Sequence, residues 1–424
     1  MKIIINPANP LWQKIIQRPH INQQDLFNKV TNIIAQVKTG GDKAIIKLTK
    51  QFDGITLNTL LIDKAAIKAA KKSISPDLKN AIKQAFKNIY TFHQIQKNEI
   101  HKIDTMEGVA CWQKMVPIEK IGLYIPGGSA PLFSTILMLG IPAKIAQCKQ
   151  VILCTPPNKN NQVHPAILYT ASLVGIKEIY SIGGAQAIAA MACGTKTIPQ
   201  VYKIFGPGNQ FVTAAKQWVQ LQGTAIDMPA GPTELCILMD ETADIRFVAA
   251  DILAQVEHGA DSQVIIITNQ QKHIAEIKNE VQKQLSLLPR KNIAGKALLN
   301  SKIIYFSSTK KSIDFINLYA PEHLIIVKKD ADLIAEKIIN AGSIFIGNYS
   351  PEAVGDYASG TNHTLPTSGF AKMYSGVNLD SFYKKITFQK LTKTGLSNLA
   401  KTVTLMADAE QLQGHSNSVK IRLI

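Results

Sequence analysis

The sequence has 424 residues, enough for roughly two or three folded domains, and its 46% content of hydrophobic residues excludes a disordered or fibrous chain. The formal net charge of +17 comes almost entirely from lysine, since arginine occurs only at Arg18, Arg246, Arg290 and Arg422. Because base readout and bidentate phosphate recognition prefer arginine, the charge indicates a solvated lysine-rich surface with weak attraction for anionic cofactors, and no nucleic-acid partner.

Helical periodicity dominates the region that follows a short N-terminal segment, residues 1–21. Apolar residues recur three and four apart, with lysines on the opposite face, and a Gly40-Gly41 turn divides the first two helices. This region carries no residue pattern that indicates chemistry. The predicted helices cover residues 26–38, 42–52, 65–72 and 76–96.

Strands and helices alternate between residues 116 and 220. A strand, a turn and a second strand are predicted over 116–125. Further strands follow at 150–154, 178–182 and 202–205, and helices at 134–146, 164–174, 185–192 and 209–220. This alternation predicts βαβ units, which form a parallel sheet with helices on both faces, the doubly wound class.

Three glycine-rich turns follow strands of this region, at residues 126–128, 183–185 and 206–209. Two lead straight into helices, whose exposed backbone N–H groups and positive dipole end favour phosphate. Because ligands of open α/β sheets gather at the carboxyl ends of strands, three such turns together predict a dinucleotide cleft. A single glycine turn usually does no more than turn the chain, and none of the three has the spacing Gly-x-Gly-x-x-Gly.

A second alternation begins after residue 234 and predicts a second α/β sheet of similar build. After residue 378 the sequence is polar and predicts two short helices without a sheet strand. The strands of the second alternation are predicted at 235–239, 263–267, 302–306, 323–327 and 343–346, and the helices at 244–257, 270–286, 309–318 and 330–340.

The five cysteines are odd in number and have no Cys-x-x-Cys spacing, which predicts reduced thiols and weighs against a disulfide frame or a thiolate zinc site. The N-terminus has no signal-peptide pattern. The longest apolar stretch, residues 130–146, is interrupted by Pro142 and is too short to span a bilayer. We therefore expect a cytoplasmic protein without a membrane segment.

Polar residues that could bind a ligand or take part in catalysis occur in four places. Gln255 and His258 lie three apart at a helix end and could share a ligand, although a capped helix end is the simpler explanation. Glu322 and His323 precede an apolar strand and would suit general-base chemistry. Because neighbours on a strand point to opposite faces, they could serve different steps, but such a pair is more often structural.

The other two places are the polar loop 350–363, which holds two acids and a histidine, and the pair Glu410 and His415. By itself the latter pair indicates an exposed helix end. If Gln255, His258, Asp356 and His415 converge, they form a nitrogen and oxygen ligand set suited to Zn²⁺ with positions open for substrate. Sequence spacing alone does not decide whether they converge.

These residues and several motifs together resemble the histidinol dehydrogenase family over nearly the whole chain. The family's enzymes are zinc-dependent homodimers that oxidise L-histidinol to L-histidine with two NAD, through bound L-histidinal. The resemblance also implies two incomplete Rossmann-like domains, one zinc per subunit and terminal segments that cross to the partner. The motifs lie at residues 125–128, 183–187, 205–209, 227–232, 321–324 and, most specifically, 355–363.

The resemblance implies a role for individual residues. Glu322 and His323 would be the acid/base pair, with His323, a neutral imidazole near its usual pKa, taking the alcohol proton and Glu322 activating water. Thr233 stands where the family commonly has serine. Glu410 and His415 would reach the active site of the partner subunit. The implied sets are zinc at Gln255, His258, Asp356 and His415, NAD at Tyr124, Gln186 and Asn209, and substrate at Thr233, Gln255, His258, His323, Asp356, His363, Glu410 and His415.

The domain boundaries that follow divide the chain into four parts. A dimerisation segment covers residues 1–21, and a C-terminal segment that contributes to the partner's active site covers 378–424. The Rossmann-like domain with the metal and acid/base residues combines 22–121 with 234–377, and the NAD-binding domain covers 122–233.

Three other functions stay open at the level of sequence. A related zinc and NAD dehydrogenase could oxidise a different small alcohol, although His363, Glu410 and His415 favour histidinol. A zinc hydrolase could use the same metal and Glu/His pair to activate water, but the three glycine-rich turns weigh against it. Of the three alternatives, a lysine-rich nucleic-acid-binding protein is the one that the sequence supports least.

Overall fold

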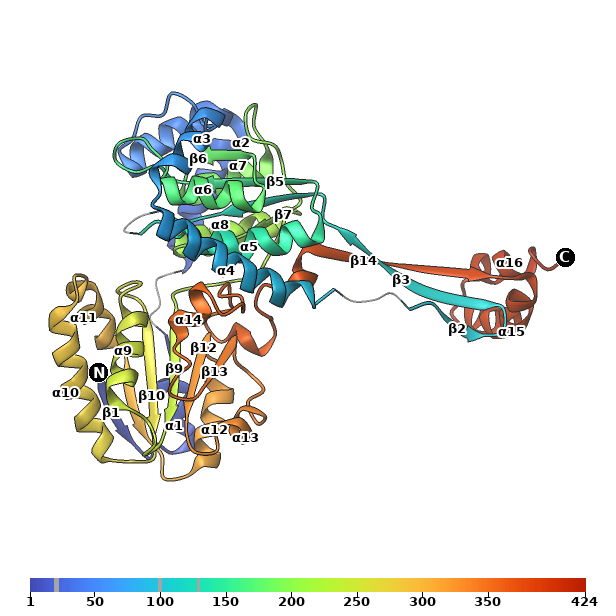
Figure 1. Cartoon of the computed structure of the whole chain (residues 1–424). Helices are drawn as coiled ribbons and strands as arrows, with labels where there is room; N and C mark the ends of the chain where they lie inside the picture. Colours follow the sequence, from blue (N-terminus) through green and yellow to red (C-terminus); the bar gives the residue numbers. More distant parts are fainter. Residues whose placement is uncertain (19–22, 98–100, 128–129) are drawn as a thin grey trace.

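The computed structural model describes residues 1–18, 23–97, 101–127 and 130–424 (Figure 1). It has an upper lobe built on a five-stranded sheet, a lower lobe built on a six-stranded sheet, and a long arm that extends from the upper lobe. Both lobe sheets are parallel throughout. The predicted α/β class with two doubly wound sheets is confirmed.

The upper sheet has the strand order β6-β5-β4-β7-β8. From β4 the chain builds outward on one side to β6 and then returns to build β7 and β8 on the other side. The carboxyl ends of β4 and β7 therefore flank the point where the strand order reverses, which is where ligands of such sheets bind. The strands are β4 (Lys120–Tyr124), β5 (Gln150–Thr155), β6 (Glu178–Ser181), β7 (Lys203–Phe205) and β8 (Ala225–Ile226), and the helices are α5 (Phe133–Ala146), α6 (Pro165–Val174), α7 (Gly184–Cys193) and α8 (Gln210–Leu221).

The N-terminal helices α2 (Gln23–Asp53), α3 (Lys64–Ser73) and α4 (Pro76–Gln94) also belong to the upper lobe. Buried residues of α2 share a core with α7 and α8, and those of α3 and α4 share one with α5 and α6. The predicted grouping of residues 22–121 with the lower sheet is therefore wrong for these helices, because an apolar stripe does not specify its packing partner. The predicted break in α2 is present at Gly41, where φ is 53°.

The lower sheet has the strand order β1-β11-β10-β9-β12-β13. Its helices are α9 (Ile245–Val256), α10 (Lys272–Leu287), α11 (Lys291–Asn300), α12 (Thr309–Tyr319), α13 (Ala331–Ala335) and α14 (Glu352–Tyr357). Helix α11 was not predicted, α14 lies in the stretch 350–363 that was predicted as a loop, and α13 is shorter than predicted. The strands are β1 (Lys2–Ile5), β9 (Glu234–Met239), β10 (Gln263–Thr268), β11 (Lys302–Tyr305), β12 (His323–Val327) and β13 (Ser343–Ile346).

The N-terminal segment docks on the lower lobe of its own chain. Strand β1 pairs in parallel with β11 at the edge of the sheet. Helix α1 (Asn9–Ile15) buries Trp12, whose ring meets Phe306 and Phe315 edge-on at centroid distances of 5.7 and 5.5 Å. The dimerisation role expected for residues 1–21 stays a prediction.

The arm is an antiparallel ribbon of β2 (Ile103–Met106), β3 (Val109–Pro117) and β14 (Tyr383–Leu391), with α15 (Lys393–Ala409) and α16 (Gln413–Lys420) at its tip. The prediction that the tail lacks a strand is wrong, since β14 pairs with β3 along its nine residues. Nearly every side chain of β14 is exposed, so its sequence has no buried alternating face that could have revealed it.

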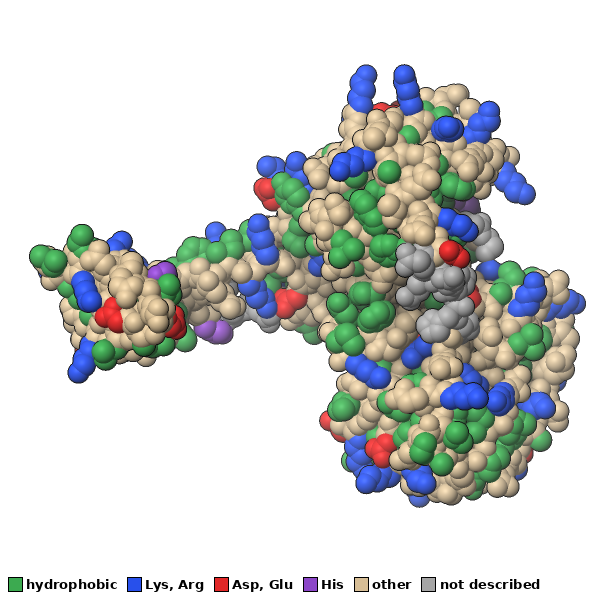
Figure 2. All heavy atoms as spheres, turned by 180° about the vertical axis from the view of Figure 1, so that it is seen from behind, with side chains coloured by type: hydrophobic (Ala, Val, Ile, Leu, Met, Phe, Trp, Pro, Cys, Tyr) green, Lys and Arg blue, Asp and Glu red, His purple; other side chains and the backbone are tan. Residues whose placement is uncertain are grey.

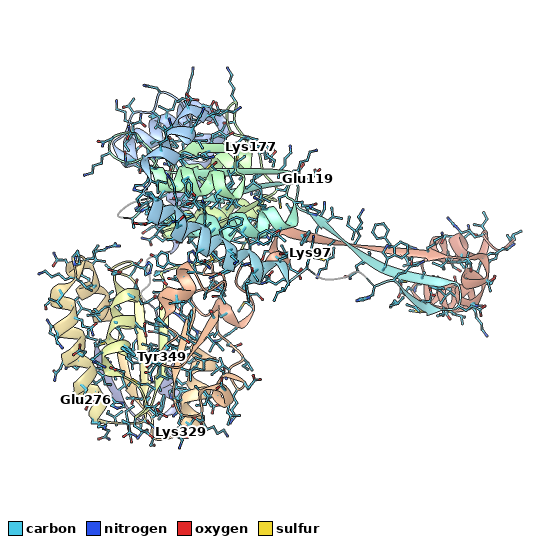
Figure 3. All side chains as sticks on the ribbon, in the orientation of Figure 1. Lys97, Glu119, Lys177, Glu276, Lys329 and Tyr349 are labelled. Carbon is cyan, nitrogen blue, oxygen red and sulfur yellow. The ribbon has the colours of Figure 1, made fainter. Side chains whose placement is uncertain are left out.

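Charged side chains are spread over both lobes. In Figure 2 the lysines and arginines of one face are scattered among apolar and polar side chains. The labelled residues of Figure 3 include Lys177 on the upper lobe and Glu276 and Lys329 on the lower lobe. Among the described helices, none is long and apolar enough to cross a membrane.

Candidate active site

A cavity of about 150 Å³ lies where the two lobes meet. The upper lobe lines it with loops that follow β4, β7 and β8, at the carboxyl edge of its sheet. The lower lobe lines it from the amino ends of β9 and β12, the opposite edge from the usual ligand site of a parallel sheet. The lining residues are Leu132, Ser134, Thr135, Gly206, Pro207, Asp227, Met228, Ala230, Gly231, Thr233, His258, Glu322, His323, Asp356, Tyr357, His363, Thr364, Leu365 and Thr367.

Glu322 and His323 both line this cavity, and the Nδ1 of His323 lies 3.5 Å from the Oε2 of Glu322. The prediction that they face opposite sides is wrong, because Glu322 precedes β12 and does not follow its alternation. The Oε2 of Glu322 accepts hydrogen bonds from the hydroxyl of Thr233 at 2.6 Å and the backbone N–H of Glu234 at 2.9 Å.

The ring of His323 is oriented by the backbone of Glu234. Its Nδ1 lies 3.3 Å from the carbonyl oxygen of Glu234, which can only accept, so Nδ1 carries the proton of this hydrogen bond. The other ring nitrogen, Nε2, is buried and has no hydrogen-bond partner within the described part of the chain. It faces the Oδ1 of Asp356 at 3.7 Å. This arrangement leaves Nε2 to accept a proton from a ligand.

Burial by itself lowers the pKa of His323. The charges of Glu352 and Glu322 and the contact with Asp356 together raise it by more than burial lowers it, so the pKa lies well above the usual value of histidine. This differs from the neutral imidazole of ordinary pKa that the sequence led us to expect. The difference arises because acids from separate segments surround the ring.

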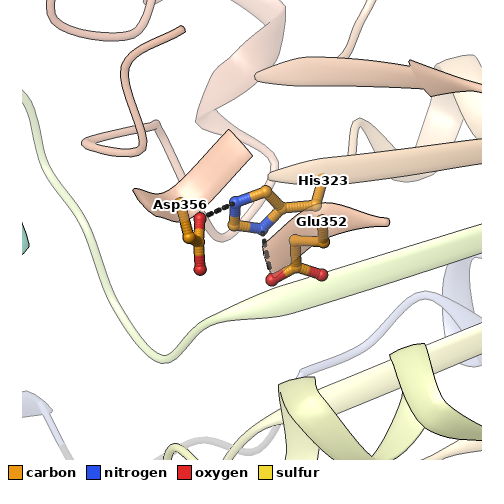
Figure 4. Close-up of side chains that lie close together, drawn as sticks. All are labelled: His323, Glu352 and Asp356. Atoms are coloured by element: carbon orange, nitrogen blue, oxygen red, sulfur yellow. Dashed lines mark ion pairs between the residues drawn. The ribbon is translucent and has the colours of Figure 1, made fainter. Parts of the chain in front are cut away.

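Glu352 and Asp356 lie one helical turn apart on α14 and flank the ring of His323 (Figure 4). The Oε1 of Glu352 is 3.7 Å from Nδ1, and one ligand atom from each of the three residues lies within 4.8 Å of the others. Such a group could hold a cation. Burial, together with Asp356 and Glu322, raises the pKa of Glu352 to about 8, although His323 opposes the shift. No role was predicted for Glu352, although its spacing of four from Asp356 is a usable signal.

Two of the other predicted metal ligands come from the end of α9. His258 lines the cavity with Asp356, and Gln255 is fully buried directly behind Thr233. The Nε2 of Gln255 donates to the hydroxyl of Thr233 at 2.6 Å, and that hydroxyl donates its single hydrogen to Glu322. His258 and Asp356 therefore line the same cavity and Gln255 lies behind its wall, but the described acids and histidines that are close enough to share a cation are His323, Glu352 and Asp356, without His258.

The fourth predicted ligand, His415, lies on α16 at the tip of the arm, and Glu410 ends α15 beside it. Both side chains are exposed. A single chain does not bring these two residues to its own cavity.

His363 links the two lobes at the cavity wall. Its Nδ1 lies 2.8 Å from the carbonyl oxygen of Asp356, and its Nε2 lies 3.1 Å from the hydroxyl of Thr135 on α5. Burial lowers the pKa of His363, which favours the neutral ring.

The residues expected to contact NAD lie at the carboxyl edge of the upper sheet. Tyr124 ends β4, and its hydroxyl accepts from the backbone N–H of Gly184 at 3.1 Å. Burial raises the pKa of Tyr124 to about 12, so the phenol stays neutral. Gln186 is buried in the first turn of α7, and Asn209 caps α8 by accepting from the N–H groups of Phe211 and Val212.

The three glycine-rich turns all follow strands of this sheet, although Gly128 in the first lies outside the described residues. Gly206 begins the third turn with φ of 129°, and a Cβ there would lie 2.0 Å from the carbonyl oxygen of Tyr124. Only glycine fits this position. The buried side chains of Asp227 and Lys216 bind the N–H and carbonyl of Gly206, respectively, at 2.8 Å each.

Comparison with known proteins agrees with the resemblance noted in the sequence. The sequence profile of the family described as histidinol dehydrogenase matches residues 16–423. A histidinol dehydrogenase from Bacteroides fragilis (strain YCH46) is 54% identical over 423 residues, which are 100% of this chain and 99% of that protein. The chain belongs to the histidinol dehydrogenase family. As a member of this family it is an oxidoreductase.

Other members and their relatives extend this comparison. A histidinol dehydrogenase from Haemophilus influenzae (strain 86-028NP) is 50% identical, with 97% of this chain and 96% of that protein covered. The crystal structure of the family member from Elizabethkingia anophelis matches with a TM-score of 0.97 and 53% identity, covering 100% of this chain and 98% of that chain. An acetylating aldehyde dehydrogenase from Geobacillus thermoglucosidasius, at 14% identity and a TM-score of 0.50, shares the fold alone.

Proposed function

We propose that this protein oxidises L-histidinol to L-histidine in histidine biosynthesis, through bound L-histidinal and with two NAD as hydride acceptors. The observation that carries the proposal is the cavity between the lobes, where Glu322, His323, His258, Asp356 and His363 meet from three separate segments. Its volume is below the ~300–1,000 Å³ of pockets for drug-sized ligands, which suits a small amino alcohol. Localisation in the cytoplasm is part of the same proposal.

In the first oxidation, the Nε2 of His323 accepts the hydroxyl proton as a hydride leaves the alcohol carbon for NAD. The hydrogen bond from Nδ1 to the carbonyl of Glu234 fixes the ring and the tautomer that this step needs. Tyr124, Gln186 and Asn209 form the NAD side of the site, at the carboxyl edge of the upper sheet. The loop at Gly206 lines the cavity on this side.

In the second oxidation, Glu322 takes a proton from the water that adds to the aldehyde carbon. His323, after releasing its first proton to solvent, then takes the proton of the hydrate as the second hydride leaves. The hydroxyl of Thr233 holds the Oε2 of Glu322 at 2.6 Å, so the threonine that replaces the family's usual serine keeps this hydrogen bond.

The donor set fits a zinc ion. His258 and Asp356 offer a nitrogen and an oxygen ligand in the cavity, and Gln255 behind its wall and His415 of a partner subunit would complete four. Bound there, zinc would hold the imidazole and amino nitrogens of the substrate and act chiefly as a template. A cation beside Asp356 also opposes the positive charge of His323, which favours the neutral ring required of a base.

The arm supports a homodimer with shared active sites. An isolated ribbon is only marginally stable in water. The arm exposes apolar side chains, among them Leu405, Met406 and Ile421, each 61% exposed, and a hollow of about 950 Å³ along the ribbon is lined by Trp112 and Phe388. Exposed apolar surface of this kind marks an interface. We propose that two subunits exchange arms and that Glu410 and His415 enter the partner's cavity.

The test of the proposed function is the amount of NADH formed per molecule of L-histidinol, with purified protein, excess NAD and zinc, before and after chelation. We expect two NADH per histidinol and loss of activity when the metal is removed. One NADH would indicate a related dehydrogenase that stops at the aldehyde. Failure to bind NAD would instead favour the alternative of a zinc hydrolase.

Glu322→Gln is expected to slow oxidation of L-histidinal more than that of L-histidinol, by about a hundredfold or more, because the amide cannot take a proton from water. Single-turnover rates from each substrate measure the two steps separately. Thr233→Ser is the matched control, since it keeps the hydroxyl that orients Glu322 and should leave both rates close to wild type. Equal slowing of both steps in Glu322→Gln would contradict this division of roles.

A further inference from the structure

A buried ion pair joins the N-terminal segment to the amino end of β9. The Nε and Nη2 of Arg18 donate to the two carboxylate oxygens of Glu234 at 2.8 Å each, and Nη2 also donates to the carbonyl oxygen of Tyr319 at 2.8 Å. The guanidinium lies over the ring of Tyr319, 4.2 Å from its centroid. The backbone N–H of Ser368 donates to Glu234 at 2.7 Å, so the side chain of Glu234 is held from two segments, those of Arg18 and Ser368.

The backbone of Glu234 touches both members of the acid/base pair. Its N–H donates to the Oε2 of Glu322 at 2.9 Å, and its carbonyl accepts from the Nδ1 of His323 at 3.3 Å. Any rotation of the two peptide groups that flank Glu234 therefore displaces Glu322 and His323 together. The side chain of Glu234, which sets this rotation, is only 2% exposed and is neutralised by Arg18.

We propose that Arg18 is a positioning residue for Glu322 and His323, acting through the carboxylate and backbone of Glu234. This inference rests on the proposed function of the same site. Arg18 touches neither the cavity nor the two catalytic side chains, so its effect is entirely on their orientation.

Only the forked guanidinium of an arginine can make both hydrogen bonds to the carboxylate of Glu234. Two parallel bonds fix the plane of the carboxylate, and the third bond to Tyr319 fixes the guanidinium itself. A lysine offers a point charge that preserves the ion pair but leaves the carboxylate free to turn. A buried ion pair adds little net stability over an apolar pair of the same volume, so stability alone does not account for this arrangement.

The test compares Arg18→Lys and Glu234→Gln with Tyr319→Phe in the full-length, zinc-loaded protein. Tyr319→Phe is a matched control, because it removes a buried hydrogen bond of 3.0 Å to Gln263 in the same core but keeps the ring under Arg18. Measured for each are kcat and KM for L-histidinol and NAD, single-turnover rates of both oxidations, zinc content and Tm.

Arg18→Lys is expected to lower both single-turnover rates by about tenfold to a hundredfold with KM and zinc content unchanged, because loss of alignment affects both catalytic residues. Glu234→Gln should have a smaller effect in the same direction, and Tyr319→Phe should lower Tm without changing either rate. The conservative variants retain the volume of the core, and Glu234→Gln tests the same link if Arg18→Lys does not fold.

Rates equal to wild type in Arg18→Lys and Glu234→Gln, with Tm lowered as in Tyr319→Phe, would overturn the positioning role and leave a purely structural ion pair. A wild-type protein that does not oxidise histidinol would instead overturn the proposed function. The two failures are therefore distinguishable in one set of measurements.

Discussion

Replacement of His323 by alanine is expected to lower the rate of histidinol oxidation by about a thousandfold, because it removes the base that accepts the alcohol proton. The expectation rests on the buried Nε2, which has no hydrogen-bond partner in the described part of the chain, and on Nδ1, which is fixed by the carbonyl of Glu234. Single-turnover formation of NADH measures the rate, and elemental analysis of the dialysed protein measures zinc. We expect zinc content equal to wild type.

His273→Ala provides the matched control. His273 is a buried histidine of the same lobe whose Nδ1 lies 3.2 Å from the hydroxyl of Thr268, and it does not line the cavity. Its loss should cost some stability and leave the rate unchanged. If His323→Ala also loses zinc, the base assignment is wrong, and the cation is held by His323, Glu352 and Asp356, the trio of Figure 4.

Mixing two inactive variants is expected to restore activity if the active site is shared between subunits. His415→Ala alters the arm and His323→Ala alters the lobe, so each homodimer has two defective sites. In a mixed dimer, one site combines the intact lobe of one subunit with the intact arm of the other. Random mixing makes half of the dimers mixed, and about a quarter of wild-type activity should return.

The mixed dimers are prepared by co-expression with two different affinity tags, and each preparation is sized by light scattering. Two variants of the same lobe, His323→Ala and Asp356→Asn, are the control and should give no recovery. A monomeric active protein, or no recovery from the lobe and arm pair, would refute the shared site.

Local structure followed closely from the sequence. The strands of residues 116–346 other than β8 were recognisable because strands buried on both faces form short apolar runs between glycine and polar turns. The kink at Gly41 and the turn at Gly206 were signalled by glycine, which alone adopts their positive φ without strain. The roles of the site residues came from the family resemblance, and four of these residues, Glu322, His323, His258 and Asp356, line one cavity in the structure.

The predictions from sequence were wrong where contact with a distant segment of the chain determines the structure. The apolar stripes of α2, α3 and α4 pack in the upper lobe, although the domain boundaries drawn from the family resemblance grouped them with the lower sheet. Strand β14 has no buried face and is defined only by its pairing with β3. Glu352 becomes part of the site only because α14 turns it toward His323. The pKa of His323 depends on its neighbour Glu322 and on Glu352 and Asp356, which lie 29 and 33 positions later in the chain.

The sequence by itself determined most helices and strands of the two lobes, the doubly wound class and the types of side chain available for chemistry. Only the tertiary structure decided that the carboxyl edge of the upper sheet faces the amino edge of the lower sheet, and that Arg18 reaches Glu234 behind the acid/base pair. The physical reason is that backbone and side-chain periodicity record which face of an element is buried. They do not record which distant segment buries it, and the site forms where such segments meet.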